Sequence, residues 1–67
     1  MYGNLIIAMK QHKPKVTQAD LARLLELSSQ GTFNKVHGDS KFDSEEMFAI
    51  QERYFPDYEI KVLFKKS

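Results

Sequence analysis

The chain has no cysteine and no tryptophan, and it holds only three glycines and two prolines in 67 residues. Without cysteine, neither a disulfide framework nor a thiolate metal site can stabilise the fold. The two histidines, His12 and His37, fall in different predicted elements and have no ligand spacing between them. We therefore expect no structural zinc site, no other metal and no cofactor.

Long hydrophobic stretches are also absent. The longest uninterrupted apolar run, Leu5 to Met9, is far too short to span a bilayer. The opening Met-Tyr-Gly-Asn lacks the basic start and the cleavage region of a secretory signal. We therefore expect no membrane partner and a cytoplasmic location.

The familiar catalytic motifs are missing as well. The sequence contains no Gly-x-Ser-x-Gly segment and no glycine-rich loop ahead of a Lys-Ser or Lys-Thr pair. A chain of this size buries roughly 60% of the surface that its unfolded form exposes, which is enough for one small core. We therefore expect a single domain, residues 1–67. Because so small a bundle seldom holds a pocket, we expect no enzyme activity.

The charged residues are unevenly distributed, although the net charge is only +1. Residues 1–41 carry six basic and three acidic side chains, a net charge of +3, whereas residues 42–67 carry four and six, a net charge of −2. A basic part beside an acidic part suits a face that binds a polyanion. Ordinary scatter of surface charge explains the same numbers, so charge alone does not assign a function.

Two helices are predicted in the first 25 residues. Asn4 can cap a helix that runs to about His12, although residues 2–7 could alternatively form a short strand. Thr17 is a good N-cap for a second helix, which runs to Leu25. The apolar stripe of this second helix consists of Leu21, Ala22 and Leu25.

A third helix, residues 29–37, is predicted after a short turn. Either Ser28 or Ser29 can cap its N-terminus. Phe33 and Val36 are three positions apart, and we expect both side chains to face the core. The helix should therefore be anchored through these two residues, with its other faces free.

A fourth helix follows the loop that begins at Gly38. Asp43 and Glu46 have the spacing of a capping box, which predicts a helix that runs to about Arg53. Its inward side chains should be Met47, Ile50 and Tyr54.

The tail, residues 57–64, fits two structures. Asp57 can cap a last helix whose inward side chains are Ile60, Leu63 and Phe64. In a strand, the alternating residues would be Tyr58, Ile60, Val62 and Phe64. We favour the helix. The predicted fold is therefore all-α, a compact bundle of four or five helices with a helix–turn–helix, and a short C-terminal strand is the alternative.

The predicted free face of the third helix is polar and poor in acidic residues. It consists of Ser29, Gln30, Gly31, Thr32, Asn34 and Lys35. In the major groove of B-DNA, Gln and Asn can pair with adenine, Ser and Thr with several base edges, and Lys with guanine or a phosphate. These residues are our candidate base contacts, although polar side chains are common on any exposed helix.

Two stretches of the sequence share a pattern with a known family. They read Thr17-Gln18-Ala19-Asp20-Leu21-Ala22-Arg23-Leu24-Leu25, followed by Leu27-Ser28, and Gln30-Gly31-Thr32-Phe33-Asn34-Lys35-Val36. This pattern resembles the helix–turn–helix of the lambdoid-phage Cro/repressor (Xre-type) family. The resemblance implies a compact helical bundle in a bacterial host cell or nucleoid, which binds operator DNA, commonly as a dimer, and regulates transcription.

The resemblance also implies roles for two glutamines. Gln18, at the N-terminus of the second helix, would touch a phosphate, and Gln30 would read a base edge. We add four flanking residues as candidate phosphate contacts: Lys15, Thr17, His37 and Lys41. The apolar tail exceeds what a small core needs, so we also expect a face for a homodimer, formed in solution or only on DNA.

Three features depart from the family pattern. Glu26 stands where the turn usually has Gly, and one extra residue lies between Leu25 and Gln30. Gly31 lies inside the third helix, at a cost of about 1 kcal/mol relative to Ala. These departures leave the register of the helix open by one residue. The alternative function is a protein–protein module of the same fold, such as a phage anti-repressor or an antitoxin-like partner, that does not read DNA.

Overall fold

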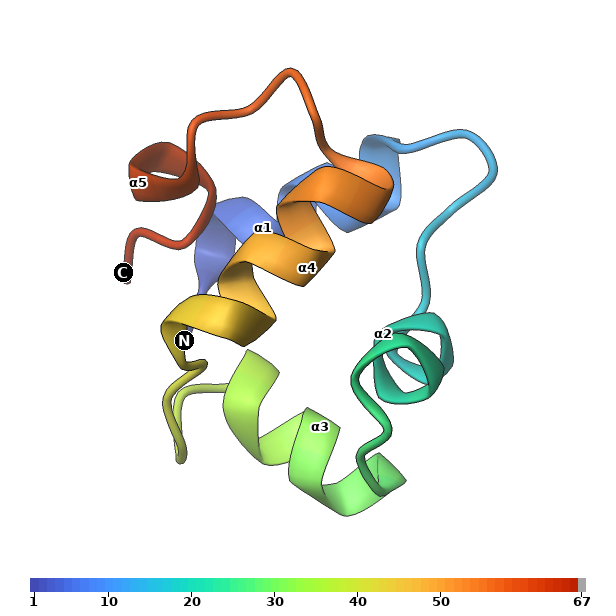
Figure 1. Cartoon of the computed structure of the whole chain (residues 1–67), viewed down its shortest axis with the longest axis vertical. Coiled ribbons are helices and arrows are strands. Elements are labelled where there is room, and N and C mark those ends of the chain that lie inside the picture. The colour runs from blue at the N-terminus through green and yellow to red at the C-terminus, as the bar shows by residue number, and fades with distance from the viewer. Residues whose placement is uncertain (67) are drawn as a thin grey trace.

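Five helices joined by short turns make up the computed structural model, which describes residues 1–66 (Figure 1). They are α1 (Gly3–Gln11), α2 (Gln18–Leu25), α3 (Ser29–Val36), α4 (Ser44–Tyr54) and α5 (Ile60–Leu63). The radius of gyration, 10.5 Å, agrees with the value of roughly 11 Å for one domain of this length. Residues 1–66 include no strand, so the all-α class predicted from the sequence is confirmed.

Reciprocal capping boxes begin α2 and α4. The Thr17 hydroxyl accepts the Asp20 N–H at 3.2 Å, and the Asp20 carboxylate accepts the Thr17 N–H at 2.9 Å. Asp43 and Glu46 make the same pair of bonds at 2.8 and 3.0 Å. Each box satisfies two backbone donors that a helix N-terminus leaves unpaired. Both predicted helix starts are therefore confirmed.

Two other predicted caps are wrong. The Asn4 side chain lies within α1 and donates to the Val62 carbonyl at 2.9 Å, so it joins α1 to α5 instead of capping. Asp57 is not the cap of α5, because Glu59 immediately precedes that helix. The helical alternatives for residues 2–7 and for the tail hold, and the strand alternatives for both segments are wrong.

The core is built mainly from aliphatic and aromatic side chains contributed by all five helices and their flanks. Its buried members are Tyr2, Leu5, Ala8, Met9, Val16, Leu21, Val36, Phe42, Ile50, Phe55, Leu63 and Phe64. The rings of Tyr2, Phe42 and Phe64 form a cluster with centroid separations of 5.2, 5.6 and 6.0 Å. These separations are typical of favourable aromatic pairs, so the cluster ties both ends of the chain to the loop before α4.

The arrangement of the helices places α3 at one side of the molecule. In Figure 1, α4 crosses the centre, α5 lies at the upper left against α1 and α4, and α3 lies below α4 and beside α2. The N-terminal segment secures the end of α3, because the Tyr2 N–H donates to the Val36 carbonyl at 3.2 Å. Within residues 1–66, no helix has the length and apolar character needed to cross a membrane.

Candidate nucleic-acid interface

The turn between α2 and α3 is made by a residue in the left-handed conformation. Glu26, just after α2, has φ 56° and ψ 41°, and the next N–H, of Leu27, donates to the Ala22 carbonyl at 2.9 Å. Ser28 then caps α3, because its hydroxyl accepts the Gly31 N–H at 3.0 Å. A Cβ atom strains the left-handed conformation, so glycine is the preferred residue at such a helix end. The two predicted helices and their turn are thus present, with Ser28 as the cap.

The register of α3 differs by one position from the predicted register. Thr32 has 0% of its surface exposed and Val36 is also buried, whereas Phe33 is 44% exposed. The Thr32 hydroxyl donates to the Ser28 carbonyl at 2.9 Å, so its burial leaves no polar group unpaired. The predictions that Phe33 faces the core and that Thr32 contacts a base are therefore wrong. The prediction that Val36 faces the core is confirmed, and residues 32 and 36, one turn apart, form the anchoring face.

The exposed face of α3 carries two amides and two rings. The Gln30 Nε2 donates to the Asn34 Oδ1 at 2.9 Å, and Asn34 is half-buried. The rings of Phe33 and His37 lie 4.2 Å apart between centroids, with 34° between their planes. Ser29 is exposed at the start of this face. Gln30, Phe33, Asn34 and His37 therefore form one continuous row, which we call the α3 row.

Lys35 is not part of the α3 row. Its Nζ lies 2.6 Å from the Glu46 Oε1 in α4, and the two side chains are only 20% and 15% exposed. The same Glu46 oxygen accepts the Asp43 N–H, so one carboxylate serves both the cap of α4 and the anchoring of α3. Lys35 faces the bundle, and its prediction as a base contact is therefore wrong. No local pattern in the sequence indicates Glu46 as its partner, because the two residues are 11 positions apart.

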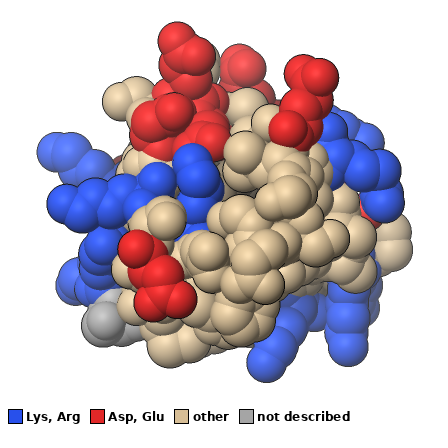
Figure 2. All heavy atoms as spheres, turned by 90° about the horizontal axis from the view of Figure 1, so that it is seen from below, with Lys and Arg blue, Asp and Glu red and all other residues tan. Residues whose placement is uncertain are grey.

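The residues predicted to contact phosphates lie at the edges of the α2–α3 unit. Lys15, Lys41 and His37 are exposed, and Thr17 and Gln18 stand at the N-terminus of α2, with the Thr17 hydroxyl used in the cap. Figure 2, seen from the side on which α3 lies in Figure 1, shows an uncharged middle with Lys and Arg side chains on both flanks and below it. Acidic side chains gather mainly along the upper edge of this view. The uncharged centre thus has positive charge on both flanks, whereas acidic side chains lie along its upper edge and also at its lower left (Figure 2).

The carboxyl group of Asp20 has a clearly lowered pKa. The hydrogen bond from the Thr17 N–H, supported by the Thr17 hydroxyl and by Arg23, holds the pKa of the Asp20 carboxyl below its ordinary value. Arg23 also forms an ion pair with Asp20 within the same helix. The N-terminus of α2 therefore keeps a negative charge that suits the helix dipole.

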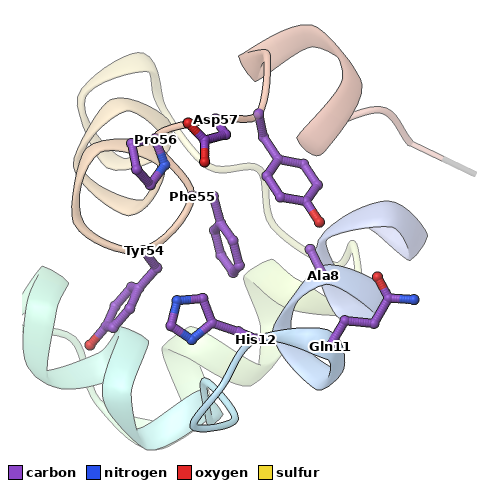
Figure 3. A pocket seen from close by; sticks show the side chains of 8 residues that line it. Ala8, Gln11, His12, Tyr54, Phe55, Pro56 and Asp57 are labelled. Atoms are coloured by element: carbon purple, nitrogen blue, oxygen red, sulfur yellow. The ribbon is translucent and has the colours of Figure 1, made fainter.

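A second feature, a pocket of about 340 Å³, lies away from α3, between the ends of α1 and α4 (Figure 3). The His12 ring lies in it, edge-on to Phe55 at 5.6 Å and to Tyr54 at 6.0 Å. Its Nδ1 donates to the Pro14 carbonyl at 2.8 Å. These contacts give His12 a packing role at the end of α1. Among residues 1–66, no three His, Asp or Glu side chains are grouped to hold a metal ion.

Of the predicted site residues, the structure brings together Ser29, Gln30 and Asn34 on one exposed face, while Gly31 is half-buried beside the Ser28 hydroxyl. Phe33, which sequence reasoning assigned to the core, joins them on that face. A helical wheel drawn in the alternative register, with Thr32 inward, would have revealed it.

Comparison of the chain with models of protein families, with curated proteins and with solved structures finds no match.

Proposed function

We propose that the protein binds double-stranded DNA sequence-specifically, with α3 in the major groove, and acts as a small transcriptional repressor of the Cro type. The observation that carries the proposal is the α3 row, an exposed face of hydrogen-bonding and aromatic side chains on a helix anchored from behind. Thr32 and Val36 hold that helix to the core, and Lys35 holds it to α4.

The dimensions and chemistry of α3 support this proposal. A helix with its side chains is about 10–12 Å in diameter, and the major groove is about 12 Å wide and therefore admits one helix such as α3. The amides of Gln30 and Asn34 suit adenine, and the Ser29 hydroxyl can serve several bases. Acidic side chains, which would repel phosphates, are absent from the sequence of α3.

The surroundings of α3 supply contacts to the backbone of the duplex. At the N-terminus of α2, the capping box uses the N–H groups of Thr17 and Asp20, so the partly exposed Gln18 side chain would make the contact to one phosphate. Lys15, Lys41 and His37 would meet other phosphates, which fixes position without reading sequence. Transcription would be blocked by occlusion of RNA polymerase.

The proposal includes a homodimer, because one recognition helix binds weakly and operators are commonly two-fold symmetric. Ile7 in α1 and Val62 in α5 are more than half exposed, and both border a hollow between these helices that Tyr58 also lines. Phe55, Leu63 and Phe64, by contrast, are used in the core. Self-association through the α1–α5 side would leave α3 free for DNA, since α5 and α3 lie on different sides of the molecule (Figure 1).

Selection of bound duplexes from a random pool tests the proposal and also reports whether the site is two-fold symmetric. We expect one preferred sequence, whose affinity falls steeply between 50 and roughly 200 mM salt because several phosphate contacts are lost. Recovery of no preferred duplex, or binding that ignores salt, would contradict the proposal and favour the protein–protein module.

Paired variants then locate the interface. Gln30→Ala should cost about 1–3 kcal/mol and relax the preference at one base pair, whereas Ser44→Ala, on an exposed position of α4, should change neither. Lys15→Ala should weaken binding to all sequences alike, whereas Lys65→Ala, at an exposed position after α5, should leave it unchanged. If Gln30→Ala and its control bind the selected duplex equally well, α3 is not the reading helix.

A further inference from the structure

An aromatic ring lies exposed in the middle of the α3 row. Phe33 follows Gln30 by three positions and precedes His37 by four, so all three side chains share one face of α3. With 44% of its surface exposed, Phe33 is much more open than the buried phenylalanines at positions 42, 55 and 64. A large apolar side chain in the centre of a polar reading face calls for an apolar partner.

The Phe33 ring is held in its exposed position. Thr32 and Val36 occupy the inward face of α3, so the core offers no room for the side chain of the neighbouring residue. On the outside, the Phe33 ring stacks on the His37 ring at 4.2 Å between centroids. A ring fixed in this way loses little conformational freedom when a partner covers it.

We propose that Phe33 is a specificity-determining residue that packs against the C5-methyl group of a thymine in the major groove. This inference rests on the DNA-binding function proposed above. The thymine methyl is the apolar group among the base edges that the major groove presents, and Phe is one of the side chains suited to it. The Lys and Arg side chains on both flanks of the uncharged face (Figure 2), with Lys15 before α2 and Lys41 after α3, favour DNA over an apolar protein surface as the partner.

The position of the thymine follows from helix geometry. Three residues of α-helix rise about 4.5 Å, and successive base pairs are about 3.4 Å apart. The thymine that Phe33 contacts should therefore lie within two base pairs of the base that Gln30 reads.

The hydrogen bond between Gln30 and Asn34 indicates which base Gln30 reads. The bond uses one hydrogen of the Gln30 Nε2 and leaves the other hydrogen and the Oε1 free. These two groups are the pair that adenine requires, with the oxygen on N6 and the nitrogen on N7. Asn34 thus positions the Gln30 amide without taking its reading groups. The structure assigns to α3 a half-site with an adenine and a thymine close together.

The test replaces each thymine of the selected duplex, one at a time, with deoxyuridine, which lacks only the methyl group. We expect one position, within two base pairs of the Gln30 site, at which this change weakens binding about three- to fivefold, the amount expected for one buried methyl group. In Phe33→Ala the same replacement should have no effect. Phe48→Ala is the matched control, because Phe48 on α4 is also exposed, at 53%, and this variant should keep the full sensitivity to deoxyuridine.

The outcomes separate this inference from the proposed function. If a sequence is selected but deoxyuridine weakens no position in the unmodified protein, Phe33 does not read thymine, whereas DNA binding stands. Equal sensitivity of the unmodified protein and of Phe33→Ala also overturns the inference, and Phe33→Leu, which keeps an apolar side chain, should retain part of the effect. If no duplex is selected at all, the proposed function fails and takes the inference with it.

Discussion

The helices α2 and α3 are neighbours of equal length, yet the bundle holds them in different ways. Each has eight residues and a hydroxyl side chain at its N-cap. α2 is anchored by leucines, with Leu21 fully buried and Leu24 and Leu25 partly buried. α3 is anchored by one valine, one hydrogen-bonded threonine and an ion pair. A helix can therefore present nearly all of its outward face to a partner when a few specific contacts fix it from behind.

Truncating the apolar anchor of each helix should give the largest effects. Leu21→Ala should cost about 3–5 kcal/mol, a large part of the stability of so small a domain, because it removes a fully buried side chain from the centre. Val36→Ala should cost less, about 2 kcal/mol, because only two methyl groups are lost. Urea denaturation followed by circular dichroism measures both. Equal costs for the two variants would contradict the view that α3 is the more lightly anchored helix.

The C-terminal ends of α2 and α3 provide a second comparison, in which one substitution should stabilise the protein and the other should destabilise it. α2 ends on Glu26 with φ 56°, whereas α3 is followed by Gly38 with φ 91°. Glu26→Gly should raise the free energy of unfolding by about 1 kcal/mol, because it relieves left-handed strain in a residue that has a Cβ. Gly38→Ala should lower it by at least as much, since the new Cβ would also lie 2.8 Å from the Met1 nitrogen. A loss of stability in Glu26→Gly would mean that its side chain makes a compensating contact.

The sequence predicts the parts of the fold that depend on local spacing. The capping boxes at Thr17 and Asp43 each lie within four residues, so their chemistry is visible in the sequence. The register of α3 is not local, because it depends on how the turn at Glu26 aims the next helix at the core. A pattern of apolar residues favours Phe33 as the inward residue over Thr32, yet burial of Thr32 costs little once its hydroxyl bonds to the Ser28 carbonyl.

The candidate site is only partly predictable for the same reason. Helical periodicity alone predicts that Gln30 and Ser29 lie on the exposed face. It fails for Lys35, because its partner Glu46 comes from another helix and no local rule connects them. Local spacing also predicts Asn4 as a cap, whereas its amide reaches Val62, 58 positions away. For Lys35 and Asn4, local rules fail because the partner lies far along the chain.

Ion pairs extend the comparison of the two helices. The pair between Lys35 and Glu46 joins two helices and is mostly covered, whereas the pair between Arg23 and Asp20 lies within α2, with the Arg23 side chain 72% exposed. A double-mutant cycle with alanine should give a coupling of about 1 kcal/mol for the first pair. The second pair should give less, because water and salt screen an exposed pair. A larger coupling within α2 would show that the ion pair is not what secures α3.

The smallest expected effect on the free energy of unfolding concerns the N-termini of α2 and α3, and it depends on pH. α2 carries Asp20 in its first turn, whereas α3 has no acidic residue there. Since the pKa of Asp20 is lowered in the folded state, chiefly by the Thr17 N–H, the carboxylate contributes stability above about pH 4 that is lost as the pH falls through the lowered value. The free energy of unfolding lost in Asp20→Asn, relative to the unmodified protein, should therefore shrink between pH 6 and about pH 3.

Ser28→Ala, which removes the cap of α3, should cost about 1 kcal/mol at both pH values, because a hydroxyl does not titrate. Denaturation curves at the two pH values decide the matter. A loss in Asp20→Asn that stays constant with pH would show that the charge on Asp20 does not stabilise α2.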